Sequence, residues 1–258
     1  LSLAVIGGCA GVGLFKGILA TAPDISNIDV SPTGFSTTVY DKEGNPITKL
    51  VAADSNRIYV TIDKIPEDFQ HAFVAIEDER FYTHPGIDIK GIMRAGVQGI
   101  RSGGKFSEGA STITQQLLKN NVFTGWTSES GLVERFKRKF QEQYLAIELE
   151  KTMDKDTILE NYLNTINLGQ STLGVQAASL RYFNKPASQI NLSEAAVIAA
   201  ITQNPTRYNP ISNPESNAER RQKVLNDMLD QGYITQPEYD EAMADNVYDR
   251  IQNVNSQT

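Results

Sequence analysis

The chain has 258 residues, of which 40% are hydrophobic and 21% charged, as in a folded protein of one large or two small domains. Its net charge of −7 argues against a general nucleic-acid-binding protein, because neutralising phosphates requires a basic surface. One cysteine, Cys9, excludes a disulfide framework, and two histidines are too few for a zinc site. We therefore predict no protein-built metal site, and we expect any anionic ligand to meet a local cluster of cations.

Residues 1–22 open with an apolar run, LSLAVIGGCAGVGLF, that lasts until Lys16. The run has no polar face and is a little shorter than the ~20 apolar residues that cross a bilayer. We predict that it is the trimmed end of a membrane-spanning or signal-anchor helix; a buried core helix is the alternative. Residues 23–63 are predicted to be a linker and a β-hairpin region, since residues 36–63 alternate apolar and polar around the turn sequence KEGNP.

Helices are predicted for most of the remaining chain. Pro66 suits a first helical turn, and apolar residues then repeat at helical spacing up to Glu77. A glycine-rich segment, residues 101–110, precedes Thr112 and Gln115, which have the spacing of a capping box. Further helices are predicted at 133–151, 155–166, 172–183, 193–201, 213–231 and after a second capping box at 235–238.

Residues 77–86, EDERFYTHPG, place Glu77 and Asp78 at the C-terminal end of an apolar helix. Carboxylates there face the negative end of the helix dipole, which costs stability. Two neighbouring negative charges also strengthen each other as bases, and a carboxylate can serve as general base toward an alcohol. The alternative is a solvated acidic helix end with a structural His84 in the following turn.

In the helix predicted at 133–151, Arg138 and Lys139 lie on the same face as Glu142, with Arg135 nearby. The apolar residues of this helix share another face: Val133, Phe136, Phe140, Tyr144 and Ile147. Three cations around one carboxylate in an acidic protein indicate an anionic ligand, and arginine matches phosphate or pyrophosphate. The alternative is a solvent-exposed face with ordinary i,i+4 ion pairs.

Residues 109–120, GASTITQQLLKN, begin a helix that carries Gln115, Gln116 and Lys119 after a glycine-rich loop. A helix N-terminus can hold an anion, and amide side chains can bind sugar hydroxyls. The alternative is an ordinary capped helix.

Together these segments resemble the peptidoglycan glycosyltransferases, glycosyltransferase family 51, found in class A penicillin-binding proteins and monofunctional transglycosylases. The similarity covers about residues 36–245, in the order EDERFYTHPG, GASTITQQLLKN, RKFQE, ILENYLN, NPTRYNP and RRQKVLNDM. The resemblance implies a mainly α-helical, lysozyme-like domain at residues 64–245, with a small N-terminal β-hairpin region and an N-terminal membrane helix. Residues 246–258 would then be a linker that leads to a transpeptidase domain.

The resemblance also implies an activity, the polymerisation of lipid II into β-1,4-linked glycan by inverting transfer from a polyprenyl-pyrophosphate-linked donor. Glu77 would be the catalytic base, and Glu142, the second essential glutamate, would orient cations, a divalent ion or the donor. Lys119, Arg138 and Lys139 would stabilise the leaving pyrophosphate. The remaining substrate-binding residues implied are Asp78, Phe81, His84, Gly86, Gly109, Ser111, Thr112, Gln115, Gln116, Arg135, Asn164 and Arg220.

The cofactor expected from the resemblance is Mg²⁺ or Mn²⁺ on the pyrophosphate, with no organic cofactor. Expected partners are lipid II, the growing polyprenyl-linked glycan, the membrane and divisome or elongation proteins, with no nucleic acid. The implied location is a single-pass protein of the cell membrane with its catalytic domain on the extracytoplasmic face. Val122, Phe123 and Trp126 lie in a loop that is predicted to dip into the membrane.

The sequence departs from the family after YLN, where TINLGQSTLGV replaces an aromatic pair and a Gly-x-Gly, so local packing is expected to differ. Two other functions remain open at this point. A lysozyme-like glycoside hydrolase acting on finished peptidoglycan also uses two carboxylates, although it needs no cations for pyrophosphate. A non-catalytic scaffold for wall synthesis needs neither Glu77 nor Glu142.

Overall fold

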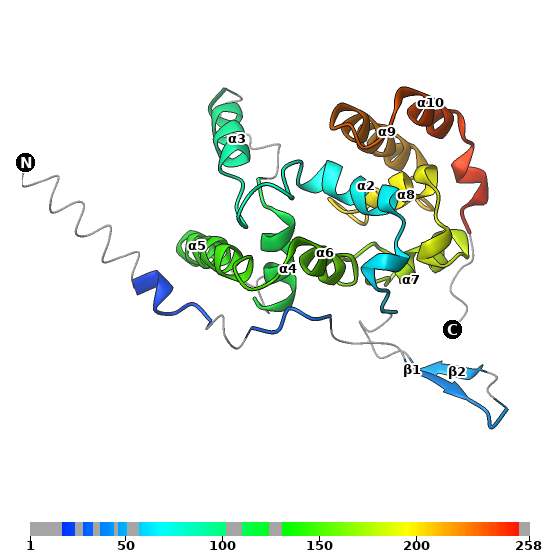
Figure 1. Cartoon of the computed structure of the whole chain (residues 1–258), viewed down its shortest axis with the longest axis horizontal. Coiled ribbons are helices and arrows are strands. Elements are labelled where there is room, and N and C mark those ends of the chain that lie inside the picture. Colours follow the sequence, from blue (N-terminus) through cyan, green and yellow to red (C-terminus); the bar gives the residue numbers. More distant parts are fainter. Residues whose placement is uncertain are drawn as a thin grey trace, which may run out of the picture. The chain divides into compact units, whose positions relative to one another are not determined.

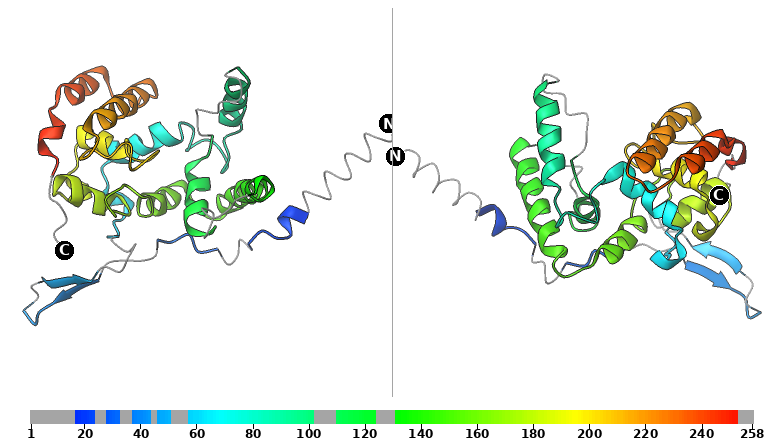
Figure 2. Two further views of the ribbon diagram at one scale, coloured as in Figure 1. Left: turned by 180° about the vertical axis from the view of Figure 1, so that it is seen from behind. Right: turned by 45° about the horizontal axis from the view of Figure 1, so that its top comes forward.

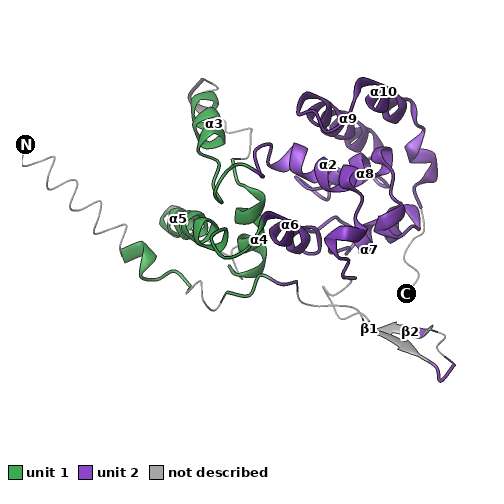
Figure 3. Ribbon diagram, in the orientation of Figure 1, with its two compact units in different colours: residues 1–30, 83–154 green, residues 31–82, 155–258 purple. Residues whose placement is uncertain are grey.

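The computed structural model of the protein describes residues 17–23, 28–32, 37–43, 46–50, 57–101, 110–123 and 131–252. These residues are mainly helical, as the sequence predicts (Figure 1). The chain divides into two compact units (Figure 3). Unit 1 consists of residues 1–30 and 83–154, and unit 2 of residues 31–82 and 155–258.

Unit 2 contains the strands β1 (Thr37–Tyr40) and β2 (Pro46–Leu50). They pair antiparallel in the segment where the sequence predicts a hairpin. Tyr40 pairs with Pro46 and skips Ile47, so the ladder is irregular next to the proline. Proline has no N–H to donate, which makes a strand end with an irregular register a suitable place for it.

The helices of unit 2 pack around α8. Their bounds are η2 (Ile62–Lys64), α2 (Glu67–Glu77), α6 (Lys155–Leu163), α7 (Val175–Phe183), η4 (Ala187–Gln189), α8 (Leu192–Ala199), α9 (Pro214–Asp230), α10 (Gln236–Ala244) and η5 (Val247–Arg250). Residues 193–201 are all buried, and α8 contacts α2, α7, α9 and α10. Both views in Figure 2 show α9 and α10 side by side. The alanines of α8 let these neighbours approach closely, so α8 lies in the core of the unit.

Helix ends follow the capping chemistry of the sequence. The predicted capping boxes at Thr112 and at Thr235 are both formed. A further capping box joins Asn191 to Glu194 at the start of α8. Glu194 is fully buried, and it accepts hydrogen bonds from Lys185 and Arg250, which neutralise its charge inside the unit.

Unit 1 contains α3 (Ile89–Arg101), α4 (Ile113–Asn121) and α5 (Leu132–Leu149), with α4 packed against α5. Gly86 meets α5 at its backbone: a Cβ on this residue would lie 2.3 Å from the carbonyl oxygen of Ala146. Gly86 also has φ +93°, a conformation that side chains disfavour. A residue with a side chain at position 86 would therefore clash with the backbone of α5, and glycine avoids this clash.

No helix within the described ranges is long and apolar enough to cross a membrane. The apolar run of residues 1–16, on which the predicted membrane helix depends, lies outside those ranges, as do Gly109 and Trp126. The membrane helix and the predicted domain boundaries stay predictions.

Candidate active site

Glu77, the predicted base, is the last residue of α2 in unit 2. The Thr202 hydroxyl donates a hydrogen bond of 2.5 Å to its Oε1, and Nη2 of Arg220 lies 3.8 Å from the same oxygen. The Glu77 side chain is 13% exposed, so it is partly accessible to a reactant. Glu77 is thus held by groups from the turn after α8 and from α9.

The surroundings of Glu77 include the cation of Arg220 together with polar and acidic groups. The guanidinium of Arg220 lies over the ring of Tyr208, at 5.1 Å from its centroid, which restricts its movement. Tyr162 on α6 is fully buried, and this burial, reinforced by the charges of Glu77 and Asp78, raises its pKa well above the ordinary value. Tyr162 therefore stays protonated and neutral beside these two carboxylates.

Two other predicted site residues of unit 2, Asp78 and Phe81, are buried in its frame. The Asp78 N–H caps α2 by donating to the carbonyl oxygen of Val74, and its side chain is buried. Phe81 is fully buried, with Nζ of Lys155 at 4.5 Å from its ring centroid. These positions fix the chain immediately after Glu77; the predicted substrate contacts of both residues stay predictions.

Asn164 joins the end of α6 to the segment that precedes η2. Its Oδ1 accepts from the N–H of Val60 at 2.9 Å, and its Nδ2 donates to the carbonyl oxygens of Val60 and Glu160 at 2.8 and 2.9 Å. Both amide hydrogens are therefore used within the protein. These hydrogen bonds give Asn164 a structural role, because they tie the end of α6 to Val60. Its contact with substrate stays a prediction.

Glu142, the second predicted glutamate, is buried on α5 in unit 1, with 1% of its surface exposed. Nη1 of Arg138 donates to its Oε2 at 2.9 Å, and Nζ of Lys139 donates to its Oε1 at 2.6 Å. Lys139 also donates to the hydroxyl of Ser111 at 2.8 Å. The interpretation as an ordinary solvent-exposed ion-pair face is wrong for this carboxylate, because water does not reach it.

Lys119 on α4 is half-buried near the same group. Burial lowers its pKa, Glu142 opposes this effect, and the positive charges of Arg138 and Lys139 lower the pKa further. Among the residues that the structure describes here, three cations and one carboxylate thus gather, and the cations already repel one another. We call Lys119, Arg138, Lys139 and Glu142 the cation cluster; a bound anion would relieve its repulsion.

A second group of predicted residues in unit 1 joins the turn at Gly86 to α4. The Thr112 hydroxyl donates to the carbonyl oxygen of Gly86 at 2.7 Å, and the capping box ties Thr112 to Gln115. Nδ1 of His84 accepts from the N–H of Gly86 at 3.1 Å and lies 4.0 Å from Oε1 of Glu150. His84, Thr112 and Gln115 are all buried, which assigns them to the frame around the cation cluster.

The remaining predicted residues are more accessible. Gln116 is partly exposed on α4, and Arg135 is exposed near the start of α5.

Nε2 of the buried Gln115 has no hydrogen-bond partner within the described ranges, which is unusual for a buried amide.

The described residues do not fit a metal site built by the protein. No three His, Cys, Asp or Glu side chains gather among them, and both oxygens of Glu142 already accept from cations. A metal ion coordinated by these side chains is therefore not part of the candidate active site.

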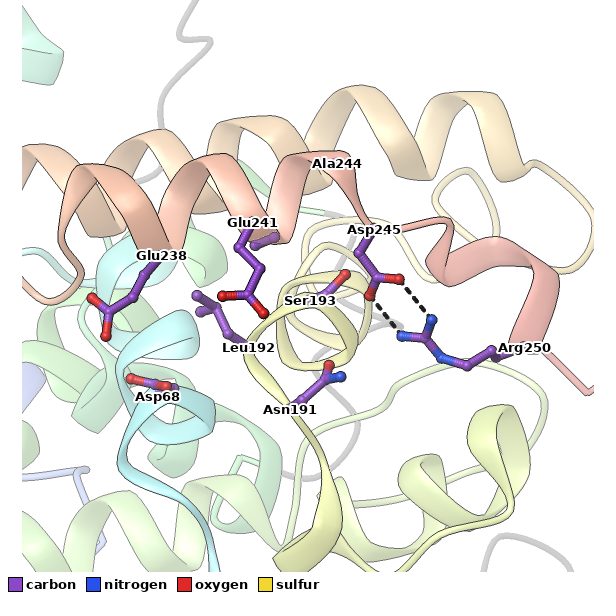
Figure 4. A pocket seen from close by; sticks show the side chains of 10 residues that line it. Asp68, Asn191, Leu192, Ser193, Glu238, Glu241, Ala244, Asp245 and Arg250 are labelled. Atoms are coloured by element: carbon purple, nitrogen blue, oxygen red, sulfur yellow. Dashed lines mark hydrogen bonds and ion pairs between the residues drawn. The ribbon is translucent and has the colours of Figure 1, made fainter.

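A cavity of about 520 Å³ lies elsewhere in unit 2, against α8 and α10 (Figure 4). Figure 4 shows Asp68, Glu238 and Glu241 toward one end and the ion pair of Asp245 with Arg250 toward the other. None of the predicted site residues lines this cavity. Its acidic lining does not suit pyrophosphate, so we do not include it in the candidate active site.

Residues 43–229, well over half of the chain, match the family described as Transglycosylase. The chain belongs to the transglycosylase family. The prediction of a peptidoglycan glycosyltransferase domain, an enzyme of cell wall synthesis, is confirmed by this match and by the relatives below.

Two curated relatives of this transglycosylase chain are penicillin-binding proteins. Penicillin-binding protein 1A of Clostridium botulinum (strain Langeland / NCTC 10281 / Type F) is 40% identical over 253 residues, covering 95% of this chain and 30% of that protein. Penicillin-binding protein 1F of Bacillus subtilis (strain 168) is 44% identical over 203 residues, covering 79% of this chain and 27% of that protein. The chain therefore spans about 30% of the length of such relatives.

Among solved structures, Penicillin-Binding Protein 1A from Haemophilus influenzae matches 84% of this chain and 21% of that chain, at 24% identity and a TM-score of 0.47.

Sequence reasoning on this transglycosylase did not identify Thr202. The residue lies 125 positions after Glu77 in the chain, and its hydroxyl reaches the carboxylate only because α8 packs against α2. The local sequence, ITQNP, carries no signal of this contact.

Proposed function

We propose that this chain polymerises lipid II into β-1,4-linked glycan strands as the transglycosylase part of a class A penicillin-binding protein, and that its helical fold is lysozyme-like. The observation that carries the proposal is the cation cluster. A buried carboxylate holds Arg138 and Lys139 in place, and the half-buried Lys119 lies near them. Three cations of this kind can stabilise the negative charge of a pyrophosphate leaving group, whereas a neutral sugar leaving group would not need them.

In the proposed reaction, Glu77 takes the proton of the 4-hydroxyl of the acceptor, lipid II. The hydroxyl oxygen forms a bond to the anomeric carbon of the donor, whose configuration inverts. The bond from that carbon to the pyrophosphate breaks, and its electron pair stays on the pyrophosphate oxygen. Lys119, Arg138 and Lys139 stabilise this developing charge, in positions set by Glu142.

The cation cluster also supports a transferase over the glycoside hydrolase. A hydrolase has no pyrophosphate leaving group to stabilise, whereas here Arg138 and Lys139 are both held by Glu142, with Lys119 nearby. Incubation with purified cell wall separates the two functions, because only a hydrolase releases soluble fragments.

We keep Mg²⁺ or Mn²⁺ in the proposal as an ion that arrives with the pyrophosphate. Its ligands would be phosphate oxygens and water, which is how magnesium often binds at phosphate sites. Polymerisation measured with and without a chelator tests this proposal: unchanged turnover in the chelator would remove the ion from it.

We propose that the membrane is a partner of unit 1. Ile89, Met93 and Val97 on α3 are each at least 50% exposed, as are Val133 and Phe136 on α5. Large exposed apolar side chains at helical spacing suit a lipid surface, and lipid II is itself held in a membrane. The single-pass anchor, the extracytoplasmic location of the domain and the divisome or elongation partners are part of the same proposal.

The test of the function is turnover of labelled lipid II by the wild type and by Glu77→Gln. Loss of a general base lowers rates by about 10²- to 10⁴-fold, so we expect no glycan polymer from the variant. Glu79→Gln is the matched control, since Glu79 lies two residues away, is exposed and pairs with Arg80. Full activity of a folded Glu77→Gln protein would refute the proposed function.

A further inference from the structure

Thr202 offers one hydroxyl proton to two acceptors. Its Oγ1 lies 2.5 Å from Oε1 of Glu77 and 3.0 Å from the carbonyl oxygen of Ala199. A hydroxyl has one hydrogen to donate and two lone pairs that accept. The proton can therefore point fully at only one of the two acceptors at a time.

The same hydroxyl can satisfy Glu77 in both of its protonation states. When Glu77 is ionised, Thr202 donates to Oε1, which is a strong, charge-assisted hydrogen bond. When Oε1 carries a proton, the carboxyl group donates to Oγ1 and the threonine proton turns to the carbonyl oxygen of Ala199. A general base passes through both states in every turnover.

The backbone holds this hydroxyl in place. Thr202 comes shortly after α8, residues 195–201 are fully buried, and α8 packs against α2, the helix that ends at Glu77. The N–H of Thr202 also bonds the Ala199 carbonyl oxygen, at 3.3 Å. A β-branched side chain has few rotamers, so the position of Oγ1 is well defined.

The other charged and titratable groups around Glu77 act differently. Arg220 on α9 approaches Oε1 at 3.8 Å, too far for a direct hydrogen bond, and so acts through charge. Tyr162 on α6 stays protonated, and Asp78 adds a negative charge. Neither Arg220 nor Asp78 can both donate and accept as Thr202 does.

We propose that Thr202 is a positioning residue for Glu77, which holds the carboxylate in place before proton transfer and accepts its hydrogen bond afterwards. This inference rests on the proposed function, in which Glu77 is the base. Thr202 itself neither gains nor loses a proton in the reaction, and it touches the base rather than the substrate.

The experiment compares Thr202→Val, which keeps the shape and removes the hydroxyl, with Thr202→Ser, which keeps the hydroxyl. Turnover of lipid II is measured across pH for both variants. Loss of a hydrogen bond to a charged group costs a factor of about 10 or more, so we expect Thr202→Val to lower kcat by at least about 10-fold. KM should change by less than about threefold, because the residue does not touch substrate.

Two further readouts distinguish positioning from a merely structural role. Donation from Thr202 favours the ionised carboxylate, so the acidic limb of the pH–kcat profile should move to higher pH in Thr202→Val. Thr202→Ser should restore both kcat and the limb. Thr206→Val, the same change at an exposed threonine four residues further along the chain, should behave as the wild type.

Each other outcome overturns the inference. If Thr202→Val stays within about twofold of the wild-type kcat while Glu77→Gln is inactive, the proposed function stands and Thr202 has no such role. Equal losses in the valine and serine variants with an unmoved acidic limb would show that the hydroxyl is not used. If Thr202→Val does not fold, Thr202→Ala is measured against the same criteria. Activity of Glu77→Gln would instead refute the function itself.

Discussion

Replacing Glu142 by glutamine should destabilise the protein far more than the same change at Glu148, which lies six residues further along α5. Glu142 is 1% exposed and accepts at 2.6 Å from Lys139 and at 2.9 Å from Arg138. Glutamine is nearly the same size but neutral, and its NH₂ group would face one of the two cations as a second donor. The variant therefore loses a charge and leaves a half-buried cation facing a donor.

The magnitude follows from burial. Breaking a buried ion pair costs about 3–5 kcal/mol, and we reduce this to about 2–4 kcal/mol because the Lys139 side chain is 37% exposed. The control is Glu148→Gln: its partner Lys151 is 60% exposed, and such a surface pair contributes about 0–1 kcal/mol. A loss of about 3 kcal/mol lowers Tm by roughly 6–12 °C in a domain of this size.

The assay is thermal unfolding of both variants followed by circular dichroism at one pH and one salt concentration. Glycan polymerisation is measured on the same samples, and Glu142→Gln should also be the slower enzyme, since Arg138 and Lys139 lose their common anchor. Equal Tm values for the Glu142 and Glu148 variants would refute the reasoning, because the burial of the first carboxylate would then have no energetic consequence.

Three further outcomes are expected. Gly86→Ala should lower the free energy of unfolding by about 3 kcal/mol or more, because of backbone strain and the clash with α5. Gly96→Ala should cause no such loss, because a Cβ at that position meets nothing within 4 Å. Equal denaturation midpoints for the two variants would contradict this prediction. Burial lowers the pKa of His71, so the unfolded chain binds a proton at this residue more readily than the folded protein does. The stability of the protein should therefore fall as the pH drops below about 6.5. His71→Phe should reduce this fall in Tm, and an unchanged dependence of Tm on pH would exclude His71 as its cause. Changing both Met93 and Val97 to serine should weaken binding to anionic vesicles about 10-fold in a flotation assay, and unchanged flotation would remove α3 from the membrane surface.

Local signals in the sequence predicted helix ends well. The helix that carries the acidic pair ends at Glu77, as its apolar spacing indicates, and the capping box at Thr112 is formed. These features depend on spacing and on single residues, so they can be read directly from the chain.

Features that depend on long-range packing could not be predicted in the same way. Helical periodicity places Glu142 on a polar face, but it does not say that this face is covered. Likewise, Val133 and Phe136 form an apolar stripe that proved to be 80% and 66% exposed. Thr202 was missed for the same reason: its partner is distant in sequence, and only the packing of α8 against α2 brings the two together.

The cation cluster has a consequence for how reactants arrive. The whole chain carries a charge of −7, so at long range it repels a free polyanion, and its few local cations act only within a Debye length of about 8 Å at physiological ionic strength. Capture of an anionic group from bulk solution is therefore slow, and attraction begins at near contact. A reactant that diffuses laterally in two dimensions, already delivered close to the protein, avoids this barrier, and its encounter rate should depend little on added salt.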